Sequence, residues 1–387
     1  MWRIWAAVLT TAACGFSPAA ATSAVHDSAG SEDAGATDAQ LLDAAPNHTC
    51  FGTLAIDQVC FANADLPSTK LDVNAEITID TDDVSSTSKC GPATLSSGDP
   101  ACVIAATSFT LSSNAKIHVV GSKPVVFVAT TTTIDKGISL NAGAILDASS
   151  VGAQVGAGAT TTACALGTTG QDPVDKGGGY GGSFSALGGS GGKGDVGTSV
   201  GGRPPPVVVT RLRGGCPGGI GEGNEKPRAI GGGVIALIAN TMVNDGTIVV
   251  GGAGGAATAT TLRGGNGGAA GGMIVLDAKL MLRGNGRVEA RGGGGGQGVG
   301  GNANQGFGGG AGYDPTNVVF EGHGGSNIGT TGGFGGDGAP RAGEMNVGGT
   351  GLIGTSTAAG GGGGGASGVI FTSIAPSADL TFKPSPN

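Results

Sequence analysis

Short runs of aliphatic and β-branched residues recur along the chain, and each is followed by a polar turn and a second, shorter apolar run. One unit runs from Val234–Ala239 through the turn Asn244–Gly246 to Thr247–Val250. β-Branched residues favour strands, and Asn-Gly or Asp-Gly steps favour turns. The pattern therefore predicts a strand, a turn and a second strand in each unit. Such units are expected in residues 102–150, 232–250, 273–290 and 369–382.

Apolar and charged residues also alternate within a unit, as in Arg287–Arg291, where Val288 and Ala290 share one face. A single unit of this kind cannot bury its own apolar face, whereas stacked units share a continuous core. We therefore predict an all-β protein with a β-solenoid, or parallel β-helix-like, body and nearly no helix. The alternative is a hairpin-based β-sandwich, because Asn244–Gly246 also suits a tight antiparallel turn.

Long glycine-rich excursions separate the units, at residues 151–231, 251–271 and 291–367, and the chain of 387 residues has 83 glycines. Glycine has no side chain to bury, so apolar burial must be concentrated in the strand units. Two interpretations of the excursions remain open. They are either flexible loops or extended glycine strands packed against the solenoid wall, where only glycine permits close backbone approach.

The N-terminus has the features of an export signal. Met1–Arg3 is positively charged and Ile4–Ala13 is an apolar run that is too short to span a bilayer as a helix. Thr11–Cys14 resembles the lipobox of bacterial lipoproteins, which implies that Cys14 is lipidated and becomes the first residue of the mature chain. The alternative is ordinary cleavage after Ala19–Ala21 followed by simple secretion.

The residues after Cys14 are small, polar and acidic, and no basic residue occurs between Arg3 and Lys70. Such a composition cannot bury enough apolar surface to fold, which predicts a disordered tether. The expected organisation is a signal peptide at 1–13, a lipid-anchored tether at 14–47 and a glycine-rich β-solenoid domain at 48–387. Gly15 is not the acidic residue that retains lipoproteins at the inner membrane. The lipobox resemblance therefore implies the outer membrane or cell surface as the location.

Six cysteines remain when Cys14 is set aside, and an even number in an exported chain predicts disulfides. Of the 15 possible connectivities, local pairing closes the shortest loops. The expected pairs are Cys50–Cys60, Cys90–Cys102 and Cys164–Cys216. Zinc is not expected, because no Cys-x-x-Cys motif occurs and His48 is the only histidine close to a cysteine.

Charge and aromatic content limit which classes of partner the chain is expected to bind. The net charge is −8 and basic residues are scattered, which argues against nucleic acid, since phosphate binding needs a basic patch. Both tryptophans lie in the signal peptide, and the remaining chain has only Tyr180 and Tyr313 as tyrosines. A glycan or matrix partner would therefore be bound mainly by hydrogen bonds. The sequence indicates no oligomeric state.

Residues with catalytic or metal-binding potential are scattered, and we expect no catalytic residue, no cofactor and no metal site. His118 lies in an apolar strand and is expected to pair or pack, while His323 is in a loop without a nucleophile nearby. Gly332–Asp337 fits the first six positions of a calcium-binding nonapeptide, but it stands alone. The acids of the strand units are expected to be isolated turn or surface residues that do not share a coil position. They are Asp135, Asp147, Asp245, Asp277 and Glu289.

A set of short motifs spread over residues 48–387 carries a family resemblance. The motifs are Cys50–Gly52, Val59–Phe61, Pro124–Ala129, Gly215–Gly219, Gly233–Ile238 and Gly368–Ile370. Together they resemble a group of glycine-rich exported proteins that occur in many copies in predatory soil bacteria. The resemblance implies a secreted or surface lipoprotein with a β-helical body and no assigned activity. The expected function is a non-catalytic structural or adhesive envelope lipoprotein. The alternative is a carbohydrate-binding or polysaccharide lyase-like β-helix protein.

Overall fold

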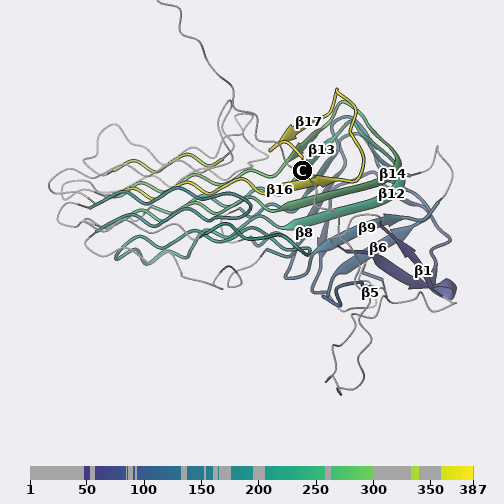
Figure 1. The fold of residues 1–387 in the computed structure, drawn as a ribbon, viewed down its shortest axis with the longest axis horizontal. Coiled ribbons are helices and arrows are strands. Elements are labelled where there is room, and N and C mark those ends of the chain that lie inside the picture. The colour runs from purple at the N-terminus through teal and green to yellow at the C-terminus, as the bar shows by residue number, and fades with distance from the viewer. Residues whose placement is uncertain are drawn as a thin grey trace, which may run out of the picture. The chain divides into compact units, whose positions relative to one another are not determined.

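Strands of successive coils stack in parallel and form the all-β solenoid predicted from the strand–turn–strand pattern (Figure 1). The computed structural model describes residues 48–386 except 53–56, 84, 86–89, 92–93, 132–136, 152–153, 160–163, 165–175, 195–204, 258–262, 300–332 and 340–358. One parallel sheet has the order β4 (Ile77–Asp80), β8 (Lys116–Val120), β11 (Ile145–Asp147), β13 (Thr247–Val249), β15 (Arg287–Glu289) and β17 (Thr381–Lys383). The other sheet has the order β3 (Leu71–Val73), β7 (Phe109–Leu111), β10 (Ile138–Leu140), β12 (Val234–Asn244), β14 (Met273–Arg283) and β16 (Val369–Thr372). In addition, β9 (Val125–Ala129) pairs with β12, and β6 (Cys102–Ala106) pairs with β9.

The turn at residues 244–246 joins the two sheets and does not form a hairpin. β12 pairs in parallel with β14, β9 and β10, whereas β13 pairs with β11 and β15 in the other sheet. The alternative of a hairpin-based sandwich is therefore wrong. The register of β12 shifts between Ala239 and Thr241, as in a β-bulge. Because bulges bend a strand, the two halves of β12 can pair with different strands, β9 and β10.

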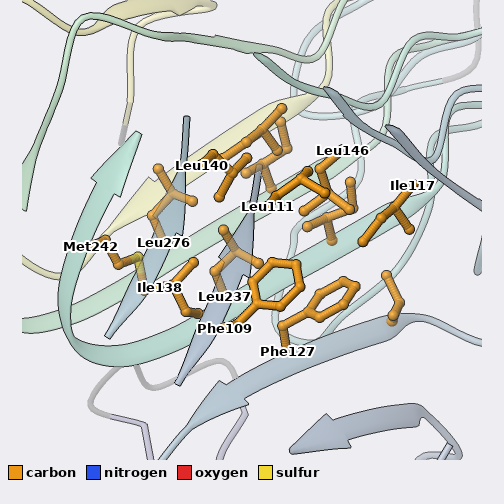
Figure 2. Packing of buried hydrophobic residues seen from close by; sticks show 14 of the residues in the cluster. Phe109, Leu111, Ile117, Phe127, Ile138, Leu140, Leu146, Leu237, Met242 and Leu276 are labelled. Atoms are coloured by element: carbon orange, nitrogen blue, oxygen red, sulfur yellow. The ribbon is translucent and has the colours of Figure 1, made fainter. Parts of the chain in front are cut away.

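The core lies between the inner faces of the two sheets, where large apolar side chains point toward one another (Figure 2). The rings of Phe109 and Phe127 stack with centroids 5.0 Å apart. In the six-stranded sheet, residues at one register position form an apolar ladder through the coils. The ladder contains Ile117, Leu146, Ile248 and Val288. Full burial of each such side chain contributes about 1.5–3 kcal/mol, so the stacked coils share one stabilising core.

A small antiparallel sheet covers the outer face of the eight-stranded sheet. It consists of β1 (His48–Phe51), β2 (Val59–Ala62) and β5 (Thr94–Leu95). Val59, Phe61 and Leu95 from this sheet join a second apolar cluster with outward side chains such as Val126 and Val275. The described residues contain one short 3-10 helix, η1 (Asn63–Asp65). None of their helices has the length and apolar character needed to cross a membrane.

All three predicted disulfides are present. Their Cα–Cα distances are 4.0 Å for Cys50–Cys60, 4.8 Å for Cys90–Cys102 and 5.6 Å for Cys164–Cys216. The first pair lies across the β1–β2 register, and the second ties the chain before β5 to the start of β6. Disulfides of this kind persist outside the reducing cytoplasm, which indicates an extracytoplasmic protein.

The described parts of the glycine-rich excursions are extended chains that bond to one another with a repeat of three residues. Within residues 263–272, every third N–H donates to residues 359–368, and the residues in between donate to 250–257 and 214–222. The hydrogen bonds to residues 359–368 run from Gly265 N to Gly360 O, from Gly268 N to Gly363 O and from Gly271 N to Ala366 O. Three residues per turn is the period of the polyproline II helix. We call this assembly the glycine bundle, made of residues 176–183, 188–192, 214–222, 229–233, 250–257, 263–272, 290–299, 333–339 and 359–368.

Residues 263–272 lie at the centre of the glycine bundle. Besides donating to three neighbours, they accept hydrogen bonds from residues 176–183, 229–233 and 290–299, which makes six neighbours in all. At Gly268, an added Cβ would lie 2.0 Å from the carbonyl oxygen of Gly293, closer than any real contact. In Figure 1 these chains are the wavy ribbons without arrows that run side by side. Of the two interpretations of the excursions, packed glycine strands are correct for the described residues, and they pack mostly against one another.

Candidate functional site

Two of the five acids singled out from the sequence, Asp147 and Glu289, lie in one row of the six-stranded sheet. Asp147 pairs with Val249, and Val249 pairs with Glu289, so one strand separates the two acids. The expectation that these acids do not share a coil position is therefore wrong. They are not surface residues either, since Asp147 is 6% exposed and Glu289 is 2% exposed. Both carboxylates face protein groups.

His118 is next to Asp147 in the same row. Its Nδ1 lies 3.2 Å from Asp147 Oδ2, and its Nε2 lies 3.4 Å from Glu76 Oε1. The hydrogen bond to Asp147 raises the pKa of His118 above its ordinary value of 6.5, although partial burial opposes the shift. The other carboxylate oxygen of Asp147 accepts the backbone N–H of Ser149 at 2.7 Å. His118 is thus a pairing residue, as predicted, and it holds neighbouring coils together.

Glu289 forms a buried ion pair with Arg291, two residues further along the chain. Arg291 Nε lies 3.2 Å from Glu289 Oε2, and Nη2 lies 3.4 Å from Oε1. Both side chains are almost fully buried. Because removal of one partner leaves a buried charge, breaking such a pair costs about 3–5 kcal/mol. The pair therefore stabilises the coil, and Glu289 is not presented to a solvent-borne substrate.

Asp277 lies beneath the small antiparallel sheet, in a row that continues from Val128 and Ile238. It is 3% exposed, so the expectation of a turn or surface acid is wrong here too. Asp277 and Asp57 both line a gap of about 10 Å³ between the two layers. Asp57 Oδ1 accepts the N–H of Ser97 at 3.0 Å, whereas its buried Oδ2 has no hydrogen-bond partner among the described residues. The gap has room for about one water molecule and for no larger ligand.

Asp245 is a turn residue, as predicted. Its carboxylate accepts the backbone N–H of Asn285 at 2.9 Å, which links the turns of adjacent coils. Several other predicted residues lie outside the described part of the chain: Cys14, Asp135, Tyr313 and His323.

The stretch that fits the calcium nonapeptide is described from Gly333 onward and belongs to the glycine bundle. Gly336 donates to Gly362, and Ala339 donates to Gly365, with the three-residue repeat of the neighbouring chains. Within the described ranges, no three His, Cys, Asp or Glu side chains are grouped so that they could hold a metal ion. Asp337 is therefore placed by bundle packing.

One important polar residue was missed by the sequence analysis. Asn266 is fully buried in the central chain of the glycine bundle. Its Oδ1 accepts the N–H of Gly221 at 3.0 Å, and its Nδ2 donates to the carbonyls of Lys226 and Pro227 at 3.2 and 3.0 Å. A single amide thus joins the central chain to the segment where residues 214–222 turn back. The signal for it was the triplet Gly-Gly-Asn within a Gly-Gly-x repeat.

The acids and the amide described above are engaged mainly by neighbouring protein groups. Comparison with family models, with curated proteins and with solved structures finds no match to this chain. The geometry of the solenoid and the glycine bundle must therefore carry the functional argument.

Proposed function

We propose that the chain is a non-catalytic structural or adhesive protein of the cell envelope or cell surface, attached to the outer membrane through lipidated Cys14. The observation that carries this proposal is the glycine bundle, whose central chain is hydrogen-bonded to six neighbours. Neutral backbone amides make these bonds, so the shape of the bundle does not depend on ion pairs that salt would screen. A stiff body of this kind suits a spacer or display scaffold outside the cytoplasm.

Two further features support this location and role. The three disulfides fit an oxidising compartment. Asp147 and Glu289, the two singled-out acids that share a row, are buried and paired with His118 and Arg291. Glycoside hydrolysis requires two carboxylates that flank the substrate. The structural or adhesive role is therefore favoured over the carbohydrate-active alternative.

Membrane attachment is tested by Cys14→Ala in the full chain, with cell fractionation and intact-mass measurement. Wild-type protein is expected in the outer-membrane fraction with an acylated N-terminal cysteine, and Cys14→Ala is expected to lose both properties. Ala21→Gln, which disturbs the competing cleavage site, is the matched control and should behave as wild type. If the wild-type protein is soluble and begins near Thr22, the proposal of lipidation is wrong and the protein is simply secreted.

The adhesive role is tested by incubating the full-length protein with cell-wall and exopolysaccharide fractions. We expect retention of the protein on at least one fraction, with the length of the polysaccharide unchanged. Shortened polysaccharide chains would favour the carbohydrate-active alternative, and the absence of retention would leave a purely structural role.

A further inference from the structure

A pocket of about 390 Å³ opens where the turns of three successive coils meet. Asp245 comes from the β12–β13 coil, Arg283 and Asn285 from the β14–β15 coil, and Ser377 and Asp379 from the last coil. The volume falls within the range of small-molecule sites. Five of its seven lining residues have charged or polar side chains, and the other two are Val243 and Gly284.

The pocket is held in shape by bonds between the turns. Asn285 N donates to Asp245 Oδ1 at 2.9 Å, and Ser377 N donates to the carbonyl of Leu282 at 3.1 Å. Gly284 has a φ of +136°, and an added Cβ would lie 2.0 Å from the carbonyl oxygen of Asn244. Glycine is therefore required at this position. The turn fixes the backbone on both sides of it, at Arg283 and Asn285.

Opposite charges share this pocket without pairing. The Arg283 side chain makes no ion pair or hydrogen bond with another described residue, and neither does the side chain of Asp379. Asp245 uses Oδ1 for the N–H of Asn285, and a carboxylate has acceptor capacity beyond one bond. One guanidinium and two carboxylates thus line a space of ligand size, and no ion pair joins them.

We propose that this pocket binds a small zwitterion of amino-acid or dipeptide size. The ligand carboxylate would take the planar fork of Arg283, which suits bidentate pairing. The ligand ammonium would lie against Asp379 and Asp245. A neutral sugar would leave the separated charges uncompensated, so a ligand with both charges is the better complement. This inference is independent of whether the chain is adhesive.

Titration of the full-length protein with alanyl-alanine, followed by ligand-observed NMR, tests the proposal. Because the pocket is open to solvent, we expect saturable binding at about millimolar concentration, weakened by added salt. N-acetyl-alanyl-alanine and alanyl-alanine amide each lack one charge and should bind about tenfold more weakly. Glucose, a neutral polyhydroxyl probe, should not compete.

Charge-selective variants assign each end of the ligand. Arg283→Gln should bind the free acid and the amide equally. Asp379→Asn should prefer the free amine over the acetylated amine by less than wild type does, because Asp245 remains. Lys279→Gln removes an exposed positive charge from the same strand outside the pocket and should leave binding unchanged. The proposal is overturned if wild type shows no saturable binding, if glucose competes, or if Arg283→Gln still prefers the acid.

Discussion

Replacement of Gly268 by alanine should disrupt the centre of the glycine bundle. The new Cβ would lie 2.0 Å from Gly293 O and 2.6 Å from Gly294 O, both backbone atoms that cannot rotate away. Ordinary contact requires about 3.4 Å, so residues 263–272 and 290–299 must separate by about 1.4 Å. This movement lengthens two hydrogen bonds between these chains, from Gly293 N to Ala269 O and from Gly296 N to Asn266 O, each now 2.8 Å.

Each buried amide left unpaired costs about 1–3 kcal/mol. Alanine restricts the unfolded chain and returns about 0.4–1 kcal/mol. The expected net effect of Gly268→Ala is therefore a loss of about 1–6 kcal/mol in the free energy of unfolding. Urea denaturation of the oxidised protein, followed by circular dichroism, measures this loss.

Gly91→Ala is the matched control, because the nearest atom to its Cβ would be Val103 O at 3.5 Å, an ordinary contact. This variant should be neutral or more stable by up to about 1 kcal/mol. If Gly268→Ala unfolds at the same urea concentration as Gly91→Ala, the close packing of the glycine bundle is refuted.

Three further predictions concern stability. Replacing Cys164 and Cys216 together by serine should cost about 4 kcal/mol in denaturation experiments, more than removal of either short-loop disulfide, because the loop spans 52 residues. The pKa of His118 is raised in the folded protein, so its stabilising pair with Asp147 is fully present below the ordinary value of 6.5 and is lost as the pH rises through the raised value. Wild type should therefore exceed His118→Gln in unfolding free energy by more at about pH 5.5 than at about pH 9, and an equal difference would contradict the assignment. Asn266→Ala should lower the urea midpoint, since three backbone groups lose their partner, and an unchanged midpoint would show that the amide is dispensable.

The solenoid could be predicted because its signal is local. Runs such as Val234–Ala239 and the alternation around Val288 record which side chains face the core, and the short loops of two cysteine pairs made their disulfides predictable. Burial of Asp277 could not be predicted, since it depends on the distant β1–β2 segment folding over that row. The shared row of Asp147 and Glu289 was also hidden. Val249, which pairs with Asp147, lies 102 positions further along the chain, and the excursion at 151–231 lies between them, so sequence spacing gives no coil register there.

The sequence could not show whether the excursions are packed or flexible, and the reason is different. Glycine has no side chain, so hydrophobic patterning, on which the strand predictions rest, says nothing about a glycine tract. The usable signal is the three-residue repeat in Gly264–Gly265–Asn266 and Gly267–Gly268–Ala269, which matches the period of a polyproline II helix. Even that repeat does not specify which chains become neighbours.

The central claim is that the glycine tracts form a rigid hydrogen-bonded body, and amide hydrogen exchange tests it most directly. The backbone N–H groups of residues 264–272 all donate to other chains of the glycine bundle, from Gly264 to Glu222 at one end to Gly272 to Val250 at the other. Exchange resolved by mass spectrometry or NMR should therefore be slowed across consecutive residues of 263–272, by at least about 100-fold relative to an unstructured peptide. Exchange in this segment at the rate of an unstructured chain would contradict the account and restore the interpretation as flexible loops.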